Sequence, residues 1–424
     1  MSSAARSDLA VIGLGYVGMP LARAATRKGL TVVGYDLDAG LVADLAAGRS
    51  HVDDLEDADV EAMLAAGFHP TTDAQDLASA AAIVICVPTP LGADGSPDLG
   101  AVEQAAATVA GVIRPGMLVV LESTTYPGTT EELLRPVLEG GGLVVGRDVH
   151  LAFSPERIDP GNAHWGPENT PKVVGGCTPA CTDAAVAMYS RFVDTVVPVS
   201  GTREAEMAKL LENTSRHVNI ALVNEMARFC HELGIDLWEV IDAASTKPFG
   251  FAAFRPGPGV GGHCIPIDPN YLSHSVRTRL GYAFRFVELA QEINSMMPTY
   301  VVQRVQSLLN DDARALRGSR VLLLGVTYKP DIADVRESPA FAVARLLRHE
   351  GALVTYHDPL VPEWHVDGDV LTAEPDLGAA VEAAHVVVLL QNHTSYDLDE
   401  IIGRATRLFD TRGVTRPGGV VERL

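Results

Sequence analysis

Short apolar runs rich in β-branched residues alternate with helical patterns through residues 1–200. The runs expected to form strands are Leu9–Gly15, Thr31–Asp36, Ala82–Val87, Met117–Glu122, His150–Phe153 and Thr195–Val199. Because helical patterns lie between several of these runs, their order predicts a parallel sheet with helices on both faces. This part of the chain is therefore expected to form a doubly wound α/β lobe.

The pattern becomes purely helical at Thr202. Residues 202–233 contain no Gly or Pro, and their apolar positions recur at helical spacing: Met207, Leu210, Leu211, Val218, Leu222, Met226 and Phe229. This spacing predicts one long helix. More helix is expected from Leu237 onward and from Phe284 to Leu309.

Strand-like runs return after residue 310. They lie at Arg320–Gly325, Leu353–His357, His385–Leu390 and Arg407–Phe409. Their order repeats that of the first lobe: one strand ends near a Gly, the next ends at an Asp, and an apolar strand follows. The whole pattern predicts an α/β fold of two Rossmann-like doubly wound lobes, residues 1–200 and 311–424, joined by a long central helix and a helical middle domain, residues 201–310.

Composition narrows the classes of partner. The 424-residue chain carries a net charge of −21, and nucleic acids and anionic membranes both bind basic surfaces, so neither is expected. No apolar run reaches the ~18 residues of a membrane span, and residues 1–8 lack the apolar core of a signal peptide. The scattered, odd set of cysteines predicts reduced thiols in a cytoplasmic protein. Cys177 and Cys181 lack a second Cys/His pair, so no metal site is expected.

A glycine motif connects the first expected strand to the helix after it. Residues 13–18 read Gly-Leu-Gly-Tyr-Val-Gly. Such glycines allow a tight turn and let backbone amides approach a pyrophosphate at a helix N-terminus. Asp36 ends the next expected strand, where its carboxylate would hold the adenosine ribose hydroxyls and repel a 2′-phosphate. In this context a dinucleotide site is favoured over a glycine turn without a ligand.

The segment from Pro256 to Asp268 combines four glycines, interleaved prolines and a cysteine, Cys264. Glycines remove side chains where a backbone passes close to a ligand. A flexible linker with an incidental cysteine is the alternative, but the prolines argue against flexibility. Lys209 and Asn213 share one face of the long helix; taken alone, such a pair is usually a solvated polar stripe.

Other polar groups follow expected strands. Residues 122–124 read Glu-Ser-Thr and residues 153–157 read Phe-Ser-Pro-Glu-Arg, each at a strand end. Open α/β sheets bind ligands at the carboxyl ends of their strands. Lys329 lies in a Tyr-Lys-Pro-Asp segment after the first strand of the second lobe. It is a candidate phosphate or uracil contact, with a plain surface lysine as the alternative.

Together these motifs resemble the UDP-glucose/UDP-N-acetylamino-sugar dehydrogenase family over nearly the whole chain. The matching segments are, in order, Gly13–Gly18, Cys86–Pro90, Glu122–Thr124, Ser154–Arg157, Ala208–Asn213, Pro256–Asp268, Tyr328–Asp331 and Asp334–Ser338. The resemblance implies an NAD-dependent nucleotide-sugar 6-dehydrogenase with Cys264 as nucleophile, flanked by Lys209 and Asp268. Asn213 and Thr124 would hold an oxyanion or a water, and Glu156 would act in acid–base chemistry near a thioester.

The resemblance also implies which residues bind the cofactor and which bind the sugar nucleotide. Cofactor-binding residues would be Gly13, Gly15, Tyr16, Val17, Gly18, Asp36, Pro88, Thr89, Thr124 and Arg336. Substrate-binding residues would be Glu156, Arg157, Lys209, Asn213, Gly261, Lys329 and Arg255. Members of the family are commonly homodimers built on the long helix, and Lys247 or Arg255 would reach the partner's site.

The chemistry is consistent with these roles. An aldehyde gives up a second hydride only after a nucleophile adds to it, and a thiolate supplies that adduct, which then collapses to a thioester. A free cysteine has a pKa of about 8.5, so the Lys209 ammonium would help to ionise Cys264. Hydrolysis of the thioester then needs a positioned water.

The sugar and the class of activity each leave an alternative. Glucose-acting members often carry a second acid where this chain has Pro160. The substrate is therefore expected to be a UDP-N-acetylhexosamine, with UDP- or TDP-glucose as the alternative, and the product would serve polysaccharide or antibiotic-sugar synthesis. An idle nucleotide-sugar sensor and a two-electron dehydrogenase are the rival classes. Counting NADH per sugar (none, one or two) separates all three.

Overall fold

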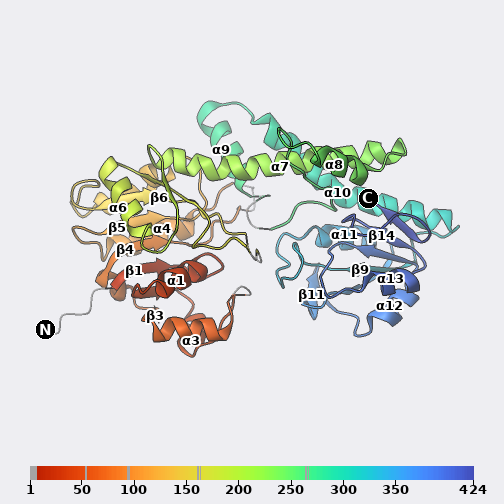
Figure 1. The fold of residues 1–424 in the computed structure, drawn as a ribbon, viewed down its shortest axis with the longest axis horizontal. Helices are drawn as coiled ribbons and strands as arrows, with labels where there is room; N and C mark the ends of the chain where they lie inside the picture. Colours follow the sequence, from red (N-terminus) through yellow and green to blue (C-terminus); the bar gives the residue numbers. More distant parts are fainter. Residues whose placement is uncertain are drawn as a thin grey trace. The chain divides into compact units, whose positions relative to one another are not determined.

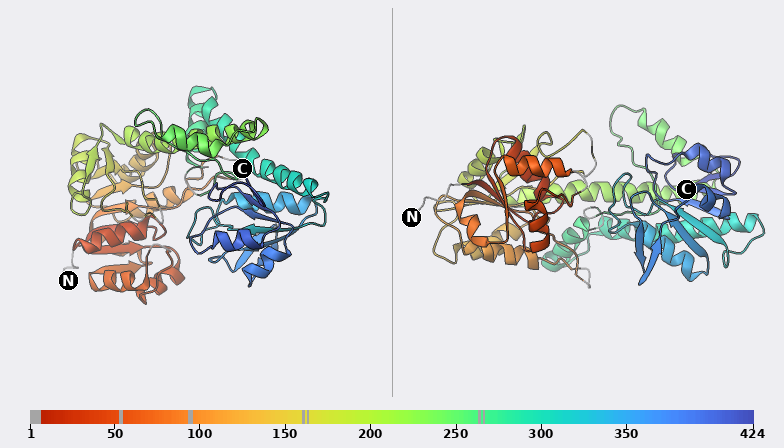
Figure 2. Two further views of the ribbon diagram at one scale, coloured as in Figure 1. Left: turned by 45° about the vertical axis from the view of Figure 1, so that its right-hand side comes forward. Right: turned by 90° about the horizontal axis from the view of Figure 1, so that it is seen from below.

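The computed structural model describes residues 7–52, 55–92, 96–159, 162, 164–262, 265 and 267–424. The chain forms two compact units, one of Met1–Glu212 with Asn270–Tyr282 and one of Asn213–Pro269 with Ala283–Leu424. Helix α7 (Thr202–Glu232) is a single unbroken helix in every view (Figures 1 and 2). Within the described part of the chain, no helix combines the length and apolarity needed to cross a membrane.

An eight-stranded sheet forms the centre of the first unit, in the order β3-β2-β1-β4-β5-β6-β7-β8. Its strands are β1 Ser7–Ile12, β2 Val32–Tyr35, β3 Phe68–Thr71, β4 Ala80–Ile85, β5 Leu118–Leu121, β6 His150–Phe153, β7 Lys172–Gly176 and β8 Val196–Pro198. All neighbours are parallel except β6 and β7. The strand order reverses between β1 and β4, and open α/β sheets bind ligands beyond the carboxyl ends of the strands at such a point.

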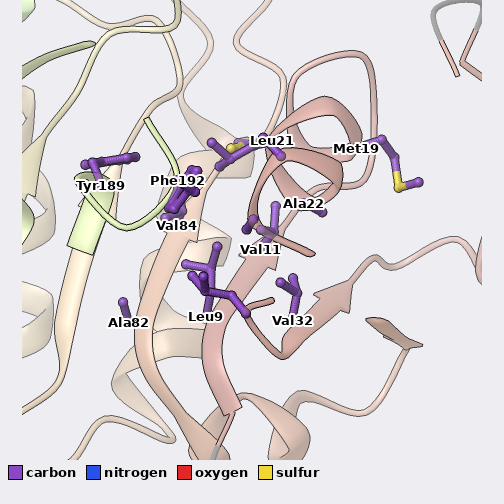
Figure 3. Close-up of a cluster of buried hydrophobic side chains, with 14 of the residues drawn as sticks. Leu9, Val11, Met19, Leu21, Ala22, Val32, Ala82, Val84, Tyr189 and Phe192 are labelled. Carbon is purple, nitrogen blue, oxygen red and sulfur yellow. The ribbon is translucent and has the colours of Figure 1, made fainter. Parts of the chain in front are cut away.

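Helices cover both faces of this sheet. They are α1 Gly18–Arg27, α2 Ala39–Ala46, α3 Asp57–Ala65, α4 Gly100–Ala110, α5 Arg135–Glu139 and α6 Pro179–Tyr189, with a short 3₁₀ helix at Ala74–Ser79 and a π-helical turn at Thr130–Leu134. Successive residues of β1 point to opposite faces. Leu9 and Val11 therefore join one core with α1, α3 and α6 (Figure 3), and Ala10 and Ile12 join another with α4 and α5. Burial on both faces explains why the strands are continuous apolar runs.

The second unit contains a five-stranded parallel sheet in the order β10-β9-β13-β14-β15. Its strands are β9 Arg320–Leu324, β10 Leu353–His357, β13 Val386–Leu389, β14 Leu408–Asp410 and β15 Val421–Arg423. Helices α10 Arg285–Asp311 and α11 Pro339–His349 pack on one face, and α12 Leu377–Ala383 and α13 Leu398–Arg404 pack on the other. Helix α8 Leu237–Ser245 packs against α7.

The α/β architecture with its helical middle segment is confirmed, and the elements expected from the apolar runs are present with ends shifted by a few residues. The pattern missed β3, β7, β15, the hairpin β11 (Glu363–Val366) and β12 (Asp369–Thr372), and helix α9 (Asp268–Leu280). β3 contains a proline and β7 ends in two glycines, so both resemble turns. The sequence does carry a signal for this hairpin, the Asp367-Gly368 dipeptide, which is typical of a tight turn. Both residues adopt the positive φ that such a turn requires.

Candidate active site

The turn after β1 shows a steric reason for two of its three glycines, Gly13 and Gly18. Gly13 has φ +90, and a Cβ there would lie 2.7 Å from the carbonyl oxygen of Cys86. A Cβ on Gly18 would overlap the carbonyl oxygen of Gly13, so α1 can begin close to the turn only with glycine at that position. A Cβ on Gly15 would meet nothing within 4 Å. The space beside Gly15 at the N-terminus of α1 is therefore open, as the approach of a pyrophosphate would require.

Asp36 follows β2 and is held beside this turn. Its carboxylate accepts hydrogen bonds from the backbone amides of Leu14, at 2.9 Å, and Asp38, at 3.0 Å. The acid is therefore oriented by the strand end and the glycine turn together. This is the arrangement in which a carboxylate binds the ribose hydroxyls of a dinucleotide.

A buried charged cluster lies behind the strand ends of β5, β6 and β7. Lys172 donates to Glu122 at 2.8 Å, lies 3.6 Å from the Glu156 carboxylate and covers the ring of Tyr189 at 5.2 Å. The Tyr189 hydroxyl donates to Glu122. Burial raises the pKa of Glu122, and the nearby Lys172 charge offsets only part of that rise. Burial also disfavours the Lys172 ammonium, but Glu122 and Glu156 outweigh this and raise its pKa.

Lys209 of α7 is buried beside the same loop. Its ammonium donates to the backbone carbonyl of Glu156 at 2.9 Å. The Glu156 carboxylate accepts from the amides of Arg157, at 2.7 Å, and Ile158. The structure therefore brings Lys209 and Glu156 together through the loop backbone, while the acid itself faces amides and Lys172.

One turn further along α7, Asn213 donates its side-chain amide to the carboxylate of Asp268. Asp268 is buried and is the first residue of α9. Two of the expected catalytic side chains are thus in direct contact. Cys264, the expected nucleophile, and Pro160, on which the choice of sugar depended, lie outside the described residues.

The glycine-rich loop before Cys264 is fastened to the helices of its own unit. The amide of Gly257 donates to buried Asn224 of α7 at 2.9 Å, and Asn224 donates to Asn294 of α10 at 2.9 Å. A Cβ on Gly261 would lie 2.7 Å from the carbonyl oxygen of Glu337 and 2.9 Å from the Cβ of Tyr328. Close packing alone therefore requires glycine at 261, beside the segment that carries Lys329.

The other residues of the first unit that are expected to bind ligands lie on loops at strand ends. The carbonyls of Thr89 and Pro90 accept from the buried hydroxyl of Tyr271, at 2.9 Å and 3.0 Å, which ties α9 to the loop after β4. Thr124 is half-buried in the loop after β5. Arg157 donates to the carbonyl of Pro171 at 2.7 Å.

In the second unit, Lys329 is half-buried in the loop after β9. Arg336 is exposed and forms a bidentate pair with Asp334, at 2.8 Å and 2.6 Å. Arg255 pairs with Asp242 at 2.5 Å and lies over the ring of Trp238. The described residues contain no group of His, Cys, Asp and Glu able to hold a metal ion.

Sequence reasoning missed several residues that position this machinery. Buried Glu206 of α7 accepts from the amides of Gly128, at 2.6 Å, and Thr130, at 2.9 Å, and so fixes the loop that carries Thr124. Lys172 and Tyr271 were missed as well. The one usable signal was scarcity, because the chain has only five lysines and Lys172 is one of them.

The fold and this site define a dinucleotide-dependent dehydrogenase with two Rossmann-like lobes. Residues 7–193, 203–296 and 322–417 match, respectively, the NAD binding, central and UDP binding domains of the UDP-glucose/GDP-mannose dehydrogenase family. The chain belongs to this family. It is an NAD-dependent nucleotide-sugar dehydrogenase, as the resemblance implied.

Individual relatives align along most of their length. The chain is 35% identical over 440 residues to a UDP-N-acetyl-D-mannosamine dehydrogenase from Yersinia pestis, covering 96% of this chain and 99% of the relative. It is 37% identical over 355 residues to a UDP-N-acetyl-D-glucosamine 6-dehydrogenase from Pseudomonas aeruginosa, covering 83% of each. A solved UDP-D-ManNAc dehydrogenase from Pyrococcus horikoshii superposes with a TM-score of 0.89 at 32% identity, covering 98% of both chains.

Asp36 is expected to set the choice between NAD⁺ and NADP⁺. Its carboxylate would meet a 2′-phosphate at close range, so kcat/KM for NAD⁺ should exceed that for NADP⁺ by ~100-fold, a difference of about 3 kcal/mol. Asp36→Asn keeps an oxygen for the Leu14 amide but removes the charge. We expect this variant to lower the ratio of kcat/KM for NAD⁺ to kcat/KM for NADP⁺ at least tenfold. Comparable kcat/KM values for both cofactors in the unmodified enzyme would contradict this role.

Proposed function

We propose that the chain oxidises the C6 alcohol of a UDP-N-acetylhexosamine to the carboxylate through a thioester on Cys264. The observation that carries this proposal is the polar face of α7, on which Lys209 and Asn213 lie one turn apart, with Asn213 bonded to Asp268. Asp268 follows Cys264 by four residues. A two-electron dehydrogenase needs no thiol, and a sensor needs none of these groups.

Each group has a distinct role in this proposal. When bound, NAD⁺ would supply the hydride acceptor for each of two successive oxidations. The Cys264 thiolate adds to the aldehyde formed first, and loss of the second hydride leaves a thioester. Lys209 favours the thiolate and, with Asn213, stabilises the oxyanion. Water then cleaves the thioester, oriented by Asp268 and Thr124, and releases the carboxylate and the thiol.

Glu156 is proposed to act in acid–base chemistry beside the thioester, with Arg157 among the substrate contacts. Proposed cofactor contacts are Gly13, Gly15, Tyr16, Val17, Gly18, Asp36, Pro88, Thr89, Thr124 and Arg336. Lys329 and Gly261 are proposed to bind the nucleotide sugar. In this scheme residues 1–200 bind NAD, residues 201–310 carry the cysteine loop and the oligomer interface, and residues 311–424 bind the nucleotide.

The N-acetylated sugar is supported by the two aligned relatives, a UDP-N-acetyl-D-mannosamine dehydrogenase and a UDP-N-acetyl-D-glucosamine 6-dehydrogenase. The position of Pro160 adds support, since loss of an acid there would make room for an acetamide and remove a charge that it would desolvate. We expect kcat/KM for the preferred N-acetylated sugar to exceed that for UDP-glucose or TDP-glucose by at least ~10-fold.

The test is one panel of UDP-GlcNAc, UDP-ManNAc, UDP-glucose and TDP-glucose under identical conditions, with NADH counted per sugar. Two NADH per N-acetylated sugar supports the proposal. A clear preference for either glucose nucleotide would contradict the proposed substrate but not the assignment as a dehydrogenase. One NADH per sugar would contradict the thioester mechanism.

We also propose that the enzyme is a homodimer that pairs through α7. Apolar side chains remain exposed along one face of this helix, Met207 40%, Leu211 66%, Leu222 53% and Phe229 45%, and at Leu233, 67%, the residue that follows it. A row of exposed apolar side chains on one helix face is typical of a surface that pairs with another. We expect a solution mass of twice the 45.0 kDa chain, and separation into monomers when Leu211 and Leu222 are both replaced by Glu. A monomeric mass for the unmodified chain at micromolar concentration would refute the interface.

A cytoplasmic location is proposed on the state of the cysteines. Cys86, Cys177, Cys181 and Cys230 are free thiols, as is usual in a reducing compartment.

In the proposed homodimer, Lys247 or Arg255 would extend to the partner's site. Both lie on the exposed segment after α8.

A further inference from the structure

In the second unit, the imidazole of His393 is buried beside the loop that carries Lys329, at the ends of three neighbouring strands. The loop, residues 327–331, follows β9; Asp358 follows β10; and His393 lies beyond β13. The strand order reverses between β9 and β13, which is where a ligand would bind in such a sheet. The side chains of His393 and Asp358 are both fully buried, with 0% exposed.

The hydrogen bonds of His393 indicate which ring nitrogen carries the proton. The backbone amide of Asp331 donates to Nδ1 at 3.0 Å, so this nitrogen carries a lone pair. Nε2 lies 3.1 Å from a carboxylate oxygen of Asp358 and therefore carries the proton. Burial alone would raise the pKa of Asp358, but the hydrogen bonds from His393 and from the amides of Leu360 and Val326 lower it, so the acid only accepts.

The same bonds hold a backbone that is strained on its own. Asp331 adopts φ +61, a conformation that is unfavourable for a non-glycine residue and persists where its surroundings enforce it. Thr327 donates its hydroxyl to the carbonyl of Lys329 at 2.8 Å, and the amide of Thr394 donates to the Asp331 carboxylate at 2.8 Å. The loop is thus fixed on both sides of Lys329.

We infer that His393, as the neutral Nε2–H tautomer held by Asp358, is the positioning residue that orients the Lys329 loop for the nucleotide sugar. This inference rests on the proposed function for the role of Lys329. His393 does not act on the reacting carbon. Its removal should therefore weaken binding of the sugar nucleotide and leave cofactor binding unchanged.

Two substitutions separate positioning from packing. His393→Asn retains an acceptor at the δ position for the Asp331 amide, whereas His393→Gln retains a donor at the ε position for Asp358 and loses that acceptor. Glutamine is closer to histidine in volume. If His393 only filled space, Gln would be the milder change; if it orients the loop, Asn would be the milder change.

The measurement is KM for the preferred UDP-sugar and for NAD⁺, together with UDP affinity by calorimetry. His393→Gln should raise the sugar KM and the UDP Kd about five- to tenfold, as expected when a buried amide loses its acceptor. His393→Asn should stay within about twofold on the same scale. The KM for NAD⁺ should not change in either variant. Equal effects of the two variants, a milder Gln, or a parallel rise in both KM values would overturn the inference.

An NMR readout does not depend on turnover. Among the 13 histidines, the ¹⁵N signals lost in His393→Gln should be those of a neutral Nε2–H imidazole. A neutral Nδ1–H or a charged ring would overturn the inference. Failure of the unmodified enzyme to oxidise any sugar nucleotide while the tautomer is as expected would instead refute the proposed function.

Discussion

Replacing Cys264 by serine is expected to abolish carboxylate formation, with a loss of rate on the order of 10³-fold or more. A serine hydroxyl is scarcely ionised at neutral pH, so it adds poorly to the aldehyde. An ester, if formed, also hydrolyses more slowly than a thioester. The experiment counts NADH per sugar and searches for a sugar ester on the variant by mass spectrometry. Two NADH per sugar at the unmodified rate would show that no thioester is used.

Cys177→Ser is the matched control for this experiment. Burial raises the pKa of Cys177 to about 12, so that thiol is not a nucleophile at neutral pH. Burial raises the pKa of Cys86 as well. We expect Cys177→Ser to retain full stoichiometry and rate. Inactivation of both variants would point to general damage from thiol replacement, and the role of Cys264 would then fail this test.

The parts of the site that the sequence predicts are those in which function depends on neighbours along the chain. The three glycines after β1 lie within six residues, and Gly13 and Gly18 each have a steric reason visible in the structure. Asp36 follows the next strand directly. Lys209 and Asn213 lie one helical turn apart. In each case the spacing alone places the groups, because strand and helix geometry are regular.

The parts that could not be predicted are contacts between distant segments. Lys172 pairs with Glu122 across 50 positions of sequence, through strands whose adjacency no local pattern reveals. Asn224 lies in the middle of a long helix, where an Asn usually faces solvent, but it accepts from the amide of Gly257. The glycine at 261 looked like an approach to ligand, and the structure adds a packing reason from Tyr328. Each of these depends on tertiary packing.

Lys172→Met is expected to destabilise the protein by roughly 3–5 kcal/mol, the usual cost of removing one member of a buried ion pair. The Lys172 ammonium lies 2.8 Å from the carboxylate of Glu122 and 3.6 Å from that of Glu156. Because its pKa is raised, the Lys172 ammonium stays charged at neutral pH. The stability that it contributes is therefore lost only as pH rises above about 10.5. Without it, Glu122 would be left buried beside Tyr189 with no countercharge.

The double variant Lys172→Met with Glu122→Gln separates the charge imbalance from loss of packing. Removing both charges leaves no isolated buried ion, so the double variant should recover at least half of the stability lost by Lys172→Met. Denaturant unfolding of the four proteins in the cycle gives the coupling free energy. Glu156 would keep its amide bonds from Arg157 and Ile158 in every variant, so the loop beside Lys209 should remain in place. A loss below about 1 kcal/mol for Lys172→Met alone would show that water reaches the cluster and that the lysine does not hold these strand ends together.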